Sequence, residues 1–232
     1  MKDTIIIATI KEWNIKQYFL LAEKYKNKFD FMLITTPKEL NYEELKKIKP
    51  KYIFFPHWSW LIPKEIYENF ESILFHMTDL PFGRGGSPFQ NLIISEIYET
   101  KVSAIRVEEG LDTGNIYLKE PFNISLGSAE ENFIELSNII FNKMIPQFLN
   151  HPIKSIPQKG KITTFKRRTP NQSNILNEQI TTMKKMYDFI RMLDAEGYPK
   201  AYIEVNNLKI EFSEVHLKKN ELVGRFEVKE NE

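Results

Sequence analysis

His76 is the residue whose type and position point most directly to chemistry. It follows the stretch Ser-Ile-Leu-Phe at 72–75, which predicts a strand, and a Gly/Pro-rich loop at 80–88 comes after it. In a parallel sheet, ligands bind beyond the carboxyl ends of the strands, where this histidine would lie. The glycines of the loop allow a ligand to approach the backbone closely. By itself the pattern is weak, because a histidine at a strand end is more often a hydrogen-bonded structural residue.

Asp112 is the second candidate. It lies in the segment Glu-Gly-Leu-Asp-Thr-Gly at 109–114, a tight loop between two expected strands, from which its carboxylate can point back toward His76. A carboxylate beside an imidazole fixes the tautomer and favours the protonated ring, which suits general acid–base catalysis. The alternative is that Asp112 is an ordinary turn residue, because Asp-Thr-Gly is common turn chemistry. The spacing alone does not decide between the two.

The elements that must position these residues alternate between strands and helices. Expected strands lie at 4–10, 29–35, 52–55, 72–75, 101–108 and 116–122. Helices are expected at 14–25, with Asn14 as its N-cap, and at 42–48, 89–98 and 129–149. This order predicts an α/β, Rossmann-like domain with a mostly parallel sheet.

The remaining third predicts a small C-terminal α+β subdomain. Polar, Pro-containing sequence at 151–176 indicates a linker with one short strand at 162–165. A helix at 178–193 and three strands at 201–205, 208–217 and 222–228 then predict a β-meander, with Asn206-Asn207 in its first turn. We therefore expect a domain at 1–150, a linker at 151–176 and a subdomain at 177–232. An edge strand of the meander could pair across a two-fold axis in a homodimer.

The composition excludes several classes of protein. The 232 residues have no cysteine, and 32 Lys/Arg against 31 Asp/Glu give a formal net charge of +1. Without cysteine there is no disulfide or thiolate chemistry, and no window approaches the ~18 consecutive apolar residues of a membrane span. No His, Asp or Glu cluster has metal-ligand spacing. We expect a cytoplasmic protein with no metal, no membrane and no nucleic-acid partner, since phosphate binding requires a basic surplus.

The stretches around His76 and Asp112 resemble the folate-dependent formyltransferase superfamily. Its members carry His-x-Ser-Leu-Leu-Pro-x-x-x-Gly after the fourth strand, then Pro-x-Gln, and later Gly-Leu-Asp-Thr-Gly-x-Ile. This chain reads His-Met-Thr-Asp-Leu-Pro-Phe-Gly-Arg-Gly at 76–85, Pro-Phe-Gln at 88–90 and Gly-Leu-Asp-Thr-Gly-Asn-Ile at 110–116. The stretch 52–63 is similar to the family segment whose backbone holds the pteridine. The resemblance covers roughly residues 1–150.

The resemblance implies a reaction and a set of site residues. An amine attacks the formyl carbon of 10-formyltetrahydrofolate, and a tetrahedral oxyanion forms; His76 moves protons or stabilises the oxyanion, and Asp112 supports His76. The implied cofactor-binding residues are Trp58, Trp60, Leu61, Ile62, Glu109, Gly110, Leu111 and Asp112. The implied substrate-binding residues in this domain are Met77, Thr78, Arg84, Gly85 and Gly86. For the two tryptophans, packing is the alternative to stacking on the folate.

Leu74 departs from the family pattern. Members normally have Asn two positions before the histidine as a second oxyanion donor. Losing one preorganised donor costs ~2.7–4 kcal/mol in comparable sites unless another group replaces it. Candidate replacements nearby in sequence are His57, Trp58, Thr78 and Asn91. We expect a divergent subfamily with a substitute donor, because His76, the Gly-rich loop and Asp112 are intact.

The C-terminal third resembles the formyltransferases that act on nucleotide-linked amino sugars. The segments 165–175 and 187–202 carry this likeness, which implies a UDP-linked 4-amino-4,6-dideoxy sugar of the pseudaminic-acid type as acceptor. On that hypothesis Lys166, Arg167 and Arg168 bind the diphosphate, where the bidentate fork of Arg is apt. The alternative for these three residues is a solvated basic run.

Three other functions stay open. The first is a methionyl-tRNA formyltransferase, disfavoured here because residues 151–232 carry only 15 Lys/Arg against 11 Asp/Glu. The second is a protein that binds folate or a nucleotide without turnover, suggested by Leu74. The third is a hydrolase that releases formate from the same folate, which production of formate without an acceptor would reveal.

Overall fold

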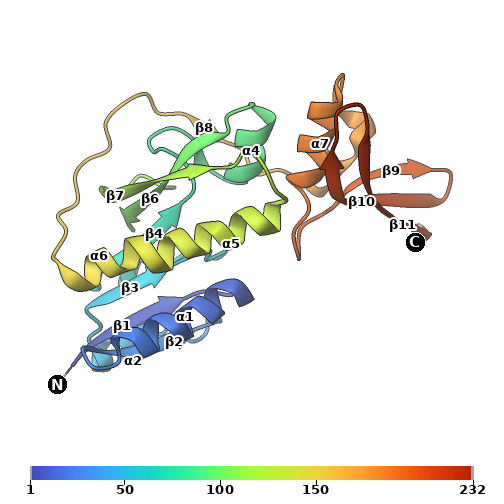
Figure 1. Ribbon diagram of the computed structural model, residues 1–232. Helices are drawn as coiled ribbons and strands as arrows, with labels where there is room; N and C mark the ends of the chain where they lie inside the picture. Colours follow the sequence, from blue (N-terminus) through green and yellow to red (C-terminus); the bar gives the residue numbers. More distant parts are fainter. Residues whose placement is uncertain (1, 231–232) are drawn as a thin grey trace. The chain divides into compact units, whose positions relative to one another are not determined.

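The computed structural model describes residues 2–230 and separates into two compact units, each built from several stretches of chain (Figure 1). The first unit comprises Met1–Arg84, Lys101–Phe122 and Ile134–Thr163. The second comprises Gly85–Thr100, Asn123–Phe133 and Thr164–Glu232. The division into a domain at 1–150, a linker and a C-terminal subdomain stays a prediction.

A six-stranded sheet in the order β2-β1-β3-β4-β6-β7 contains every strand expected in the first 123 residues. Its strands are β1 (Asp3–Ala8), β2 (Phe29–Ile34), β3 (Tyr52–Phe55), β4 (Ser72–His76), β6 (Glu99–Arg106) and β7 (Ile116–Asn123). The first four pair in parallel, whereas β6 runs antiparallel to β4 with Ile73 opposite Arg106. The predicted α/β class with a mostly parallel sheet is confirmed.

Both faces of this sheet are buried, which explains its continuous apolar runs. On one face Ile6, Ile53 and Phe55 pack against Leu45 of α2 (Tyr42–Ile48) and Ile66 of α3 (Lys64–Asn69). Phe54 points the other way, and its ring lies 5.3 Å from that of Phe148 in α6 (Ile145–Asn150).

The helix that starts the chain's first crossover, α1 (Glu12–Tyr25), begins two residues earlier than predicted. Asn14 lies inside it rather than capping it. Its buried amide donates to Thr9 Oγ1 at 2.9 Å and to Pro56 O at 3.3 Å, so it ties the ends of β1 and β3 together. An asparagine before an apolar helical stretch can be an N-cap or a buried residue of the first turn, and the local sequence does not distinguish the two. The predicted N-cap was therefore wrong.

The helix expected at 129–149 consists of α5 (Ala129–Ile139), a π-helical turn η1 (Ile140–Met144) and α6 (Figure 1). Pro146 has no N–H to donate and its ring crowds the preceding turn. The wider π turn accommodates it, with the Ile145 N–H bonded to the Ile140 carbonyl.

The remaining elements include the predicted β-meander, β9 (Ala201–Val205), β10 (Leu208–Leu217) and β11 (Leu222–Glu230), in the order β11-β10-β9. Asn206 turns the chain with φ +56°, as its place in a hairpin turn predicts. The helices are α4 (Pro88–Ile94) and α7 (Met183–Arg191), with the short helices η2 (Pro170–Ser173) and η3 (Ile175–Asn177). A two-stranded sheet, β5 (Arg84–Gly85) with β8 (Thr164–Phe165), completes the set.

Arg191 holds the second unit together from its interior. The side chain is 1% exposed, and its guanidinium donates to Asp188 Oδ1 at 2.7 Å and to the carbonyls of Ile124 and Gly127 at 2.9 Å. Asp188 also accepts from Tyr98 Oη at 2.7 Å, and burial together with this carboxylate raises the pKa of Tyr98. One buried charge therefore satisfies two loop carbonyls and a carboxylate.

We expect Arg191→Leu to lower the free energy of unfolding by about 3 kcal/mol or more, because it leaves two carbonyls unpaired and removes a partner of Asp188. Arg225→Leu is the control, since that side chain is 59% exposed and pairs only with surface carboxylates. Its cost should stay below about 1 kcal/mol. Urea unfolding of both variants measures the difference, and equal costs would contradict the central role of Arg191.

Candidate active site

His76 ends β4 at the carboxyl edge of the parallel strands, and its side chain is 8% exposed. Both ring nitrogens face protein groups: Nε2 is 2.8 Å from Gly83 O, and Nδ1 is 3.6 Å from Asp112 Oδ2. A carbonyl only accepts hydrogen bonds, so the first contact places a proton on Nε2. The carboxylate of Asp112 faces the other ring nitrogen at an ion-pair distance that is longer than a hydrogen bond.

Asp112 is held by an unusual loop conformation rather than by regular structure. Its φ is +53°, and Gly110 two residues earlier has φ +102°. A side chain at Gly114 would meet the carbonyl oxygen of Arg106, so only glycine fits there. Thr113 Oγ1 closes the loop by donating to Glu109 O at 2.9 Å. The Asp-Thr-Gly sequence is thus turn chemistry and, at the same time, brings a carboxylate to the histidine.

Gln158 fixes the same loop from outside, and sequence reasoning missed it. Its Nε2 donates to the carbonyls of Asp112 and Gly114, both at 2.8 Å, and its Oε1 accepts from Arg84 Nε and Nη2 at 3.2 and 2.7 Å. Nothing in the polar stretch around it distinguishes this glutamine from a solvated linker residue.

The residues that follow His76 are buried and engaged. Thr78 Oγ1 donates to Gly83 O at 3.3 Å, while its own carbonyl accepts from Ser103 Oγ at 2.7 Å. Met77 is also buried. Met77 and Thr78 are thus buried next to His76 in the chain, whereas Arg84 donates to Gln158, and direct contact with a substrate stays a prediction for all three.

The predicted folate-binding residues differ in exposure. Trp58 is half-buried, and its ring lies 5.0 Å from that of Trp60 in an edge contact. Ile62 packs on the apolar cluster beneath, whereas Glu109 and Gly110 are exposed. Trp60, Leu61 and Leu111 expose apolar side chains, with 94% of Leu61 accessible. Exposed apolar side chains of this kind suit a flat apolar ligand, and the binding role of the whole set stays a prediction.

Leu74 lies in an apolar cluster with Leu80, Ile105 and Ile116. The leucine also packs against the apolar cluster of Ile53 and Phe55, so its surroundings are apolar. Among the proposed substitute donors, Thr78 is committed to Gly83 O and Asn91 Nδ2 to the carbonyls of Gly86, Ser87 and Lys166. Trp58 Nε1 is buried without a hydrogen-bond partner in the described part of the chain.

The other predicted substrate-binding residues lie in the second unit. A Cβ atom at Gly85 would clash with Phe165 O, and one at Gly86 would lie 2.6 Å from Arg167 Cβ. Close packing against residues 165–167 is therefore enough to require glycine at both positions. Lys166 and Arg167 are exposed, whereas Arg168 is mostly buried and paired with Glu178 at 3.1 Å. Arg168 thus has a structural partner, and a ligand-binding role for the basic run stays a prediction.

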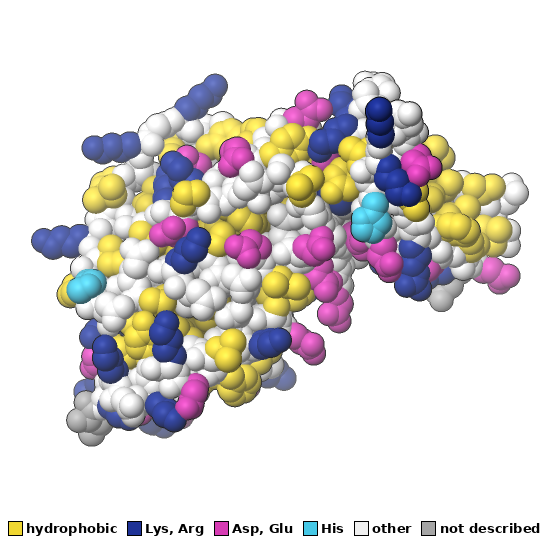
Figure 2. All heavy atoms as spheres, viewed as in Figure 1, with side chains coloured by type: hydrophobic (Ala, Val, Ile, Leu, Met, Phe, Trp, Pro, Cys, Tyr) yellow, Lys and Arg dark blue, Asp and Glu magenta, His cyan; other side chains and the backbone are white. Residues whose placement is uncertain are grey.

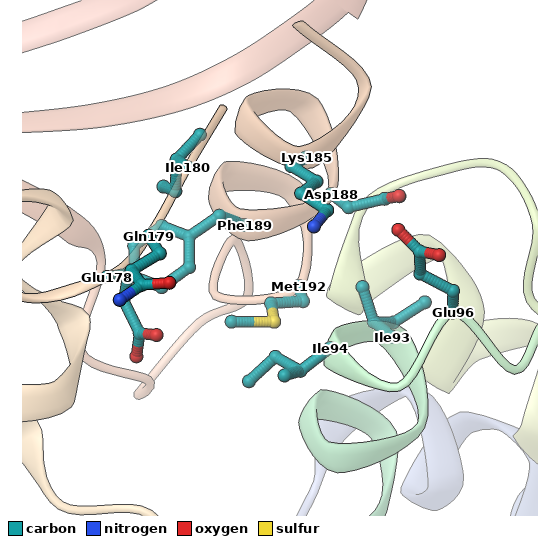
Figure 3. A pocket seen from close by; sticks show the side chains of 10 residues that line it. All are labelled: Ile93, Ile94, Glu96, Glu178, Gln179, Ile180, Lys185, Asp188, Phe189 and Met192. Atoms are coloured by element: carbon teal, nitrogen blue, oxygen red, sulfur yellow. The ribbon is translucent and has the colours of Figure 1, made fainter. Parts of the chain in front are cut away.

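A cavity of about 120 Å³ in the second unit lies between α4 and α7 (Figure 3). Apolar side chains such as Ile93, Phe189 and Met192 line it together with Glu96 and Glu178, and none of the predicted site residues does. Within residues 2–230 no cluster of His, Asp and Glu is arranged to hold a metal ion. No helix in that range is long and apolar enough to cross a membrane.

Comparison with known proteins gives matches over the whole chain. A solved structure titled methionyl-tRNA formyltransferase from Clostridium thermocellum is 48% identical, covers 99% of this chain and 100% of its own, and has a TM-score of 0.95. A methionyl-tRNA formyltransferase of Campylobacter jejuni is 28% identical over 82% of this chain. The sequence profile of the methionyl-tRNA formyltransferase C-terminal domain matches residues 170–229. The chain spans 63% of the length of that Campylobacter relative.

The predicted acceptor is wrong. A sugar N-formyltransferase from Shewanella shares the fold with a TM-score of 0.69 over 88% of this chain and 93% of its own, but only 13% of its residues are identical. The much closer 48% match bears a tRNA formyltransferase title. The findings therefore contradict the nucleotide-linked sugar, UDP and pseudaminic-acid predictions, together with the exclusion of a nucleic-acid partner. The short motifs at 165–175 and 187–202 were too degenerate to distinguish acceptor classes.

His57, beside Trp58, provides a test of this region's pH response. Burial, with a smaller effect of the Lys11 charge, lowers the pKa of His57 from 6.5 to about 4. The unfolded chain takes up this proton below pH 6.5 and the folded chain only below about pH 4, so stability falls as the pH drops from 6.5 to 4. Asn tolerates the φ of +54° at this position, so His57→Asn should fold. Between pH 7 and 4 we expect the free energy of unfolding to fall by about 3 kcal/mol less in this variant than in the unmodified protein.

Urea unfolding at a series of pH values measures this difference. His151→Asn, at an exposed position, is the matched control and should follow the unmodified protein. Parallel loss of stability in His57→Asn and the unmodified protein would contradict a lowered pKa of His57 in the folded chain.

Proposed function

Because this chain belongs to the formyltransferase superfamily, we propose that it transfers a formyl group from 10-formyltetrahydrofolate to the amino group of an aminoacyl-tRNA, with methionyl-tRNA as acceptor. The observation that carries the proposal is the 48% identity over essentially the whole chain with a protein titled methionyl-tRNA formyltransferase. The contact between His76 and Asp112 supports the proposal, because a histidine beside a carboxylate is suited to general acid–base catalysis.

In this reaction a C–N bond forms between the acceptor amine and the formyl carbon, and the bond from that carbon to the folate nitrogen breaks. The amine loses one proton and the departing folate nitrogen gains one. The Nε2–H of His76, which donates to Gly83 O, is the donor that can turn toward a developing oxyanion. The proton that the amine loses passes to the departing folate nitrogen, and Asp112 faces the other ring nitrogen, Nδ1, at 3.6 Å and helps to hold the ring in place.

The exposed apolar residues Trp60, Leu61 and Leu111 fit the ring system of the folate co-substrate. Trp58 Nε1 is the candidate replacement for the missing amide donor at Leu74, since two of the other candidates already donate to carbonyls. If no replacement acts, the protein binds folate without turnover, and this second function is the one that Leu74 favours.

A basic segment supports a tRNA acceptor. From residue 151 to 177 the chain has no Asp or Glu and six cationic residues: Lys154, Lys159, Lys161, Lys166, Arg167 and Arg168. All but Arg168 are exposed. Figure 2 shows dark-blue side chains projecting where Figure 1 draws the segment between α6 and β8. The net charge of the whole chain is near zero because acidic residues elsewhere offset the cations of this segment. Composition alone therefore argued against a nucleic-acid partner. Local cations, not total charge, contact phosphates.

Formyl transfer is tested with purified protein, radiolabelled 10-formyltetrahydrofolate and tRNA charged with methionine, following label in the aminoacyl ester. We expect transfer to charged tRNA and none to uncharged tRNA. His76→Asn should reduce the rate at least about 100-fold, because the oxyanion loses the Nε2–H donor of His76. His151→Asn is the matched control at an exposed histidine. Folate binding by calorimetry without any transfer would refute the catalytic proposal in favour of the binding function.

Substituting Lys154, Lys159 and Lys161 together by Ala should weaken tRNA binding and lessen its dependence on salt, by roughly one unit of logarithmic slope for each phosphate that is no longer neutralised. The matched control replaces Lys16, Lys28 and Lys38, which are equally exposed but lie outside the basic segment. Gel-shift titrations at several salt concentrations provide the slopes. Equal slopes for the two triple variants would exclude the segment as a phosphate-binding surface.

A further inference from the structure

The chain between α6 and β8 has no regular structure beyond a single bridge, yet it contacts both loops that face the His76 ring. On the Nδ1 side, the Gln158 amide donates to the carbonyls of Asp112 and Gly114 at 2.8 Å. On the Nε2 side, Thr163 Oγ1 accepts from Gly83 N at 2.7 Å, and the Thr163 carbonyl accepts from Arg84 N at 3.0 Å. Gly83 O is the group that accepts from His76.

Gln158 uses its full hydrogen-bonding capacity in these contacts. Both amide hydrogens go to backbone carbonyls of the Asp112 loop, and both lone-pair positions of Oε1 accept from the Arg84 guanidinium. The residue thereby links the loop that carries Asp112 with the end of the loop that carries Gly83. Asp112 has φ +53°, a conformation that costs energy for a non-glycine residue. The hydrogen bond from Gln158 to the Asp112 carbonyl therefore helps to keep the backbone in this conformation.

The linker itself does not need Gln158 as an anchor. Two residues earlier, Ile156 pairs with Ile116 through two backbone hydrogen bonds of 2.8 Å. Further on, the Thr163 N–H donates to Pro81 O at 3.3 Å. The segment is therefore fastened on both sides of Gln158, and the glutamine's own four hydrogen bonds act on the Asp112 loop and on Arg84.

From these contacts we propose that Gln158 is a positioning residue for the formyl transfer: it sets the distance and direction of Asp112 relative to His76 by clamping the carbonyls of Asp112 and Gly114. The proposal rests on the proposed function for its kinetic consequence, but its geometric consequence does not require turnover. Misplacement of a catalytic group by about 1 Å lowers rates roughly 100-fold, so loss of the clamp should act on kcat rather than on folate binding.

Two substitutions separate the parts of the clamp. Gln158→Leu removes all four hydrogen bonds and keeps a side chain of similar size. Gln158→Glu keeps acceptors for Arg84 but has no hydrogen to donate to the two carbonyls. Gln147→Leu is the matched control: this exposed glutamine of α6 also donates two hydrogen bonds, to Glu120 Oε1 and Lys143 O, away from the site.

The first readout is the ring of His76, observed by nitrogen NMR in the full-length protein and assigned by the signal missing in His76→Asn. We expect the His76 ring nitrogen shifts to move in both Gln158 variants and to stay unchanged in Gln147→Leu. Urea unfolding checks that each variant is folded. Unchanged His76 signals in folded Gln158→Leu and Gln158→Glu would overturn the proposal.

The second readout is the kinetics of formyl transfer. We expect kcat to fall roughly 10- to 100-fold in both Gln158 variants, with KM for the folate co-substrate within about two-fold of the unmodified value. A rise in KM alone, with kcat retained, would overturn the positioning role. If the unmodified protein transfers no formyl group while the His76 signals still respond to Gln158, the proposed function fails and the clamp on Asp112 stands.

Discussion

The loops at the carboxyl edge of the sheet in the first unit meet at one side chain, the His76 imidazole, which lies between a backbone carbonyl and a carboxylate. Gly83 O fixes a proton on Nε2, and Asp112 faces Nδ1 from a loop with left-handed backbone conformation. Three features of the surrounding structure bring these groups together. β4 places the ring at the sheet edge, Gly114 permits the loop to close against Arg106, and Gln158 holds the carbonyls on either side of Thr113.

Much of the sheet was predictable because its strands are buried on both faces and therefore consist of continuous apolar runs. Ile5, Ile6 and Ile7 have no exposed surface, and the sequence shows this as an unbroken β-branched stretch. The pairing of His76 with Asp112 was predictable only through motifs, since 36 positions separate the two residues and no periodicity links them. The helix start at Asn14 was misread, because a buried amide and an N-cap have the same local sequence.

The features that the sequence did not reveal are side chains bonded to distant backbone. Gln158 recognises carbonyls 44 and 46 positions away, and Arg191 recognises carbonyls 64 and 67 positions away. Backbone carbonyls are the same in every residue, so such contacts leave no compositional trace. The acceptor prediction failed for a related reason: total charge cannot report that 27 consecutive residues lack any carboxylate.

The irregular stretch after α6 resembles an ordinary surface connection, the kind of place where chains are cut, lengthened or rejoined to make permuted and fused proteins. Its register is nevertheless fixed at Ile156, Gln158 and Thr163, each bonded to a different part of the same unit. Adding or deleting one residue between these points would shift the side chains out of step with their partners. New termini or inserted domains belong instead at turns such as Lys219-Asn220, where the exposed backbone joins two strands of one hairpin.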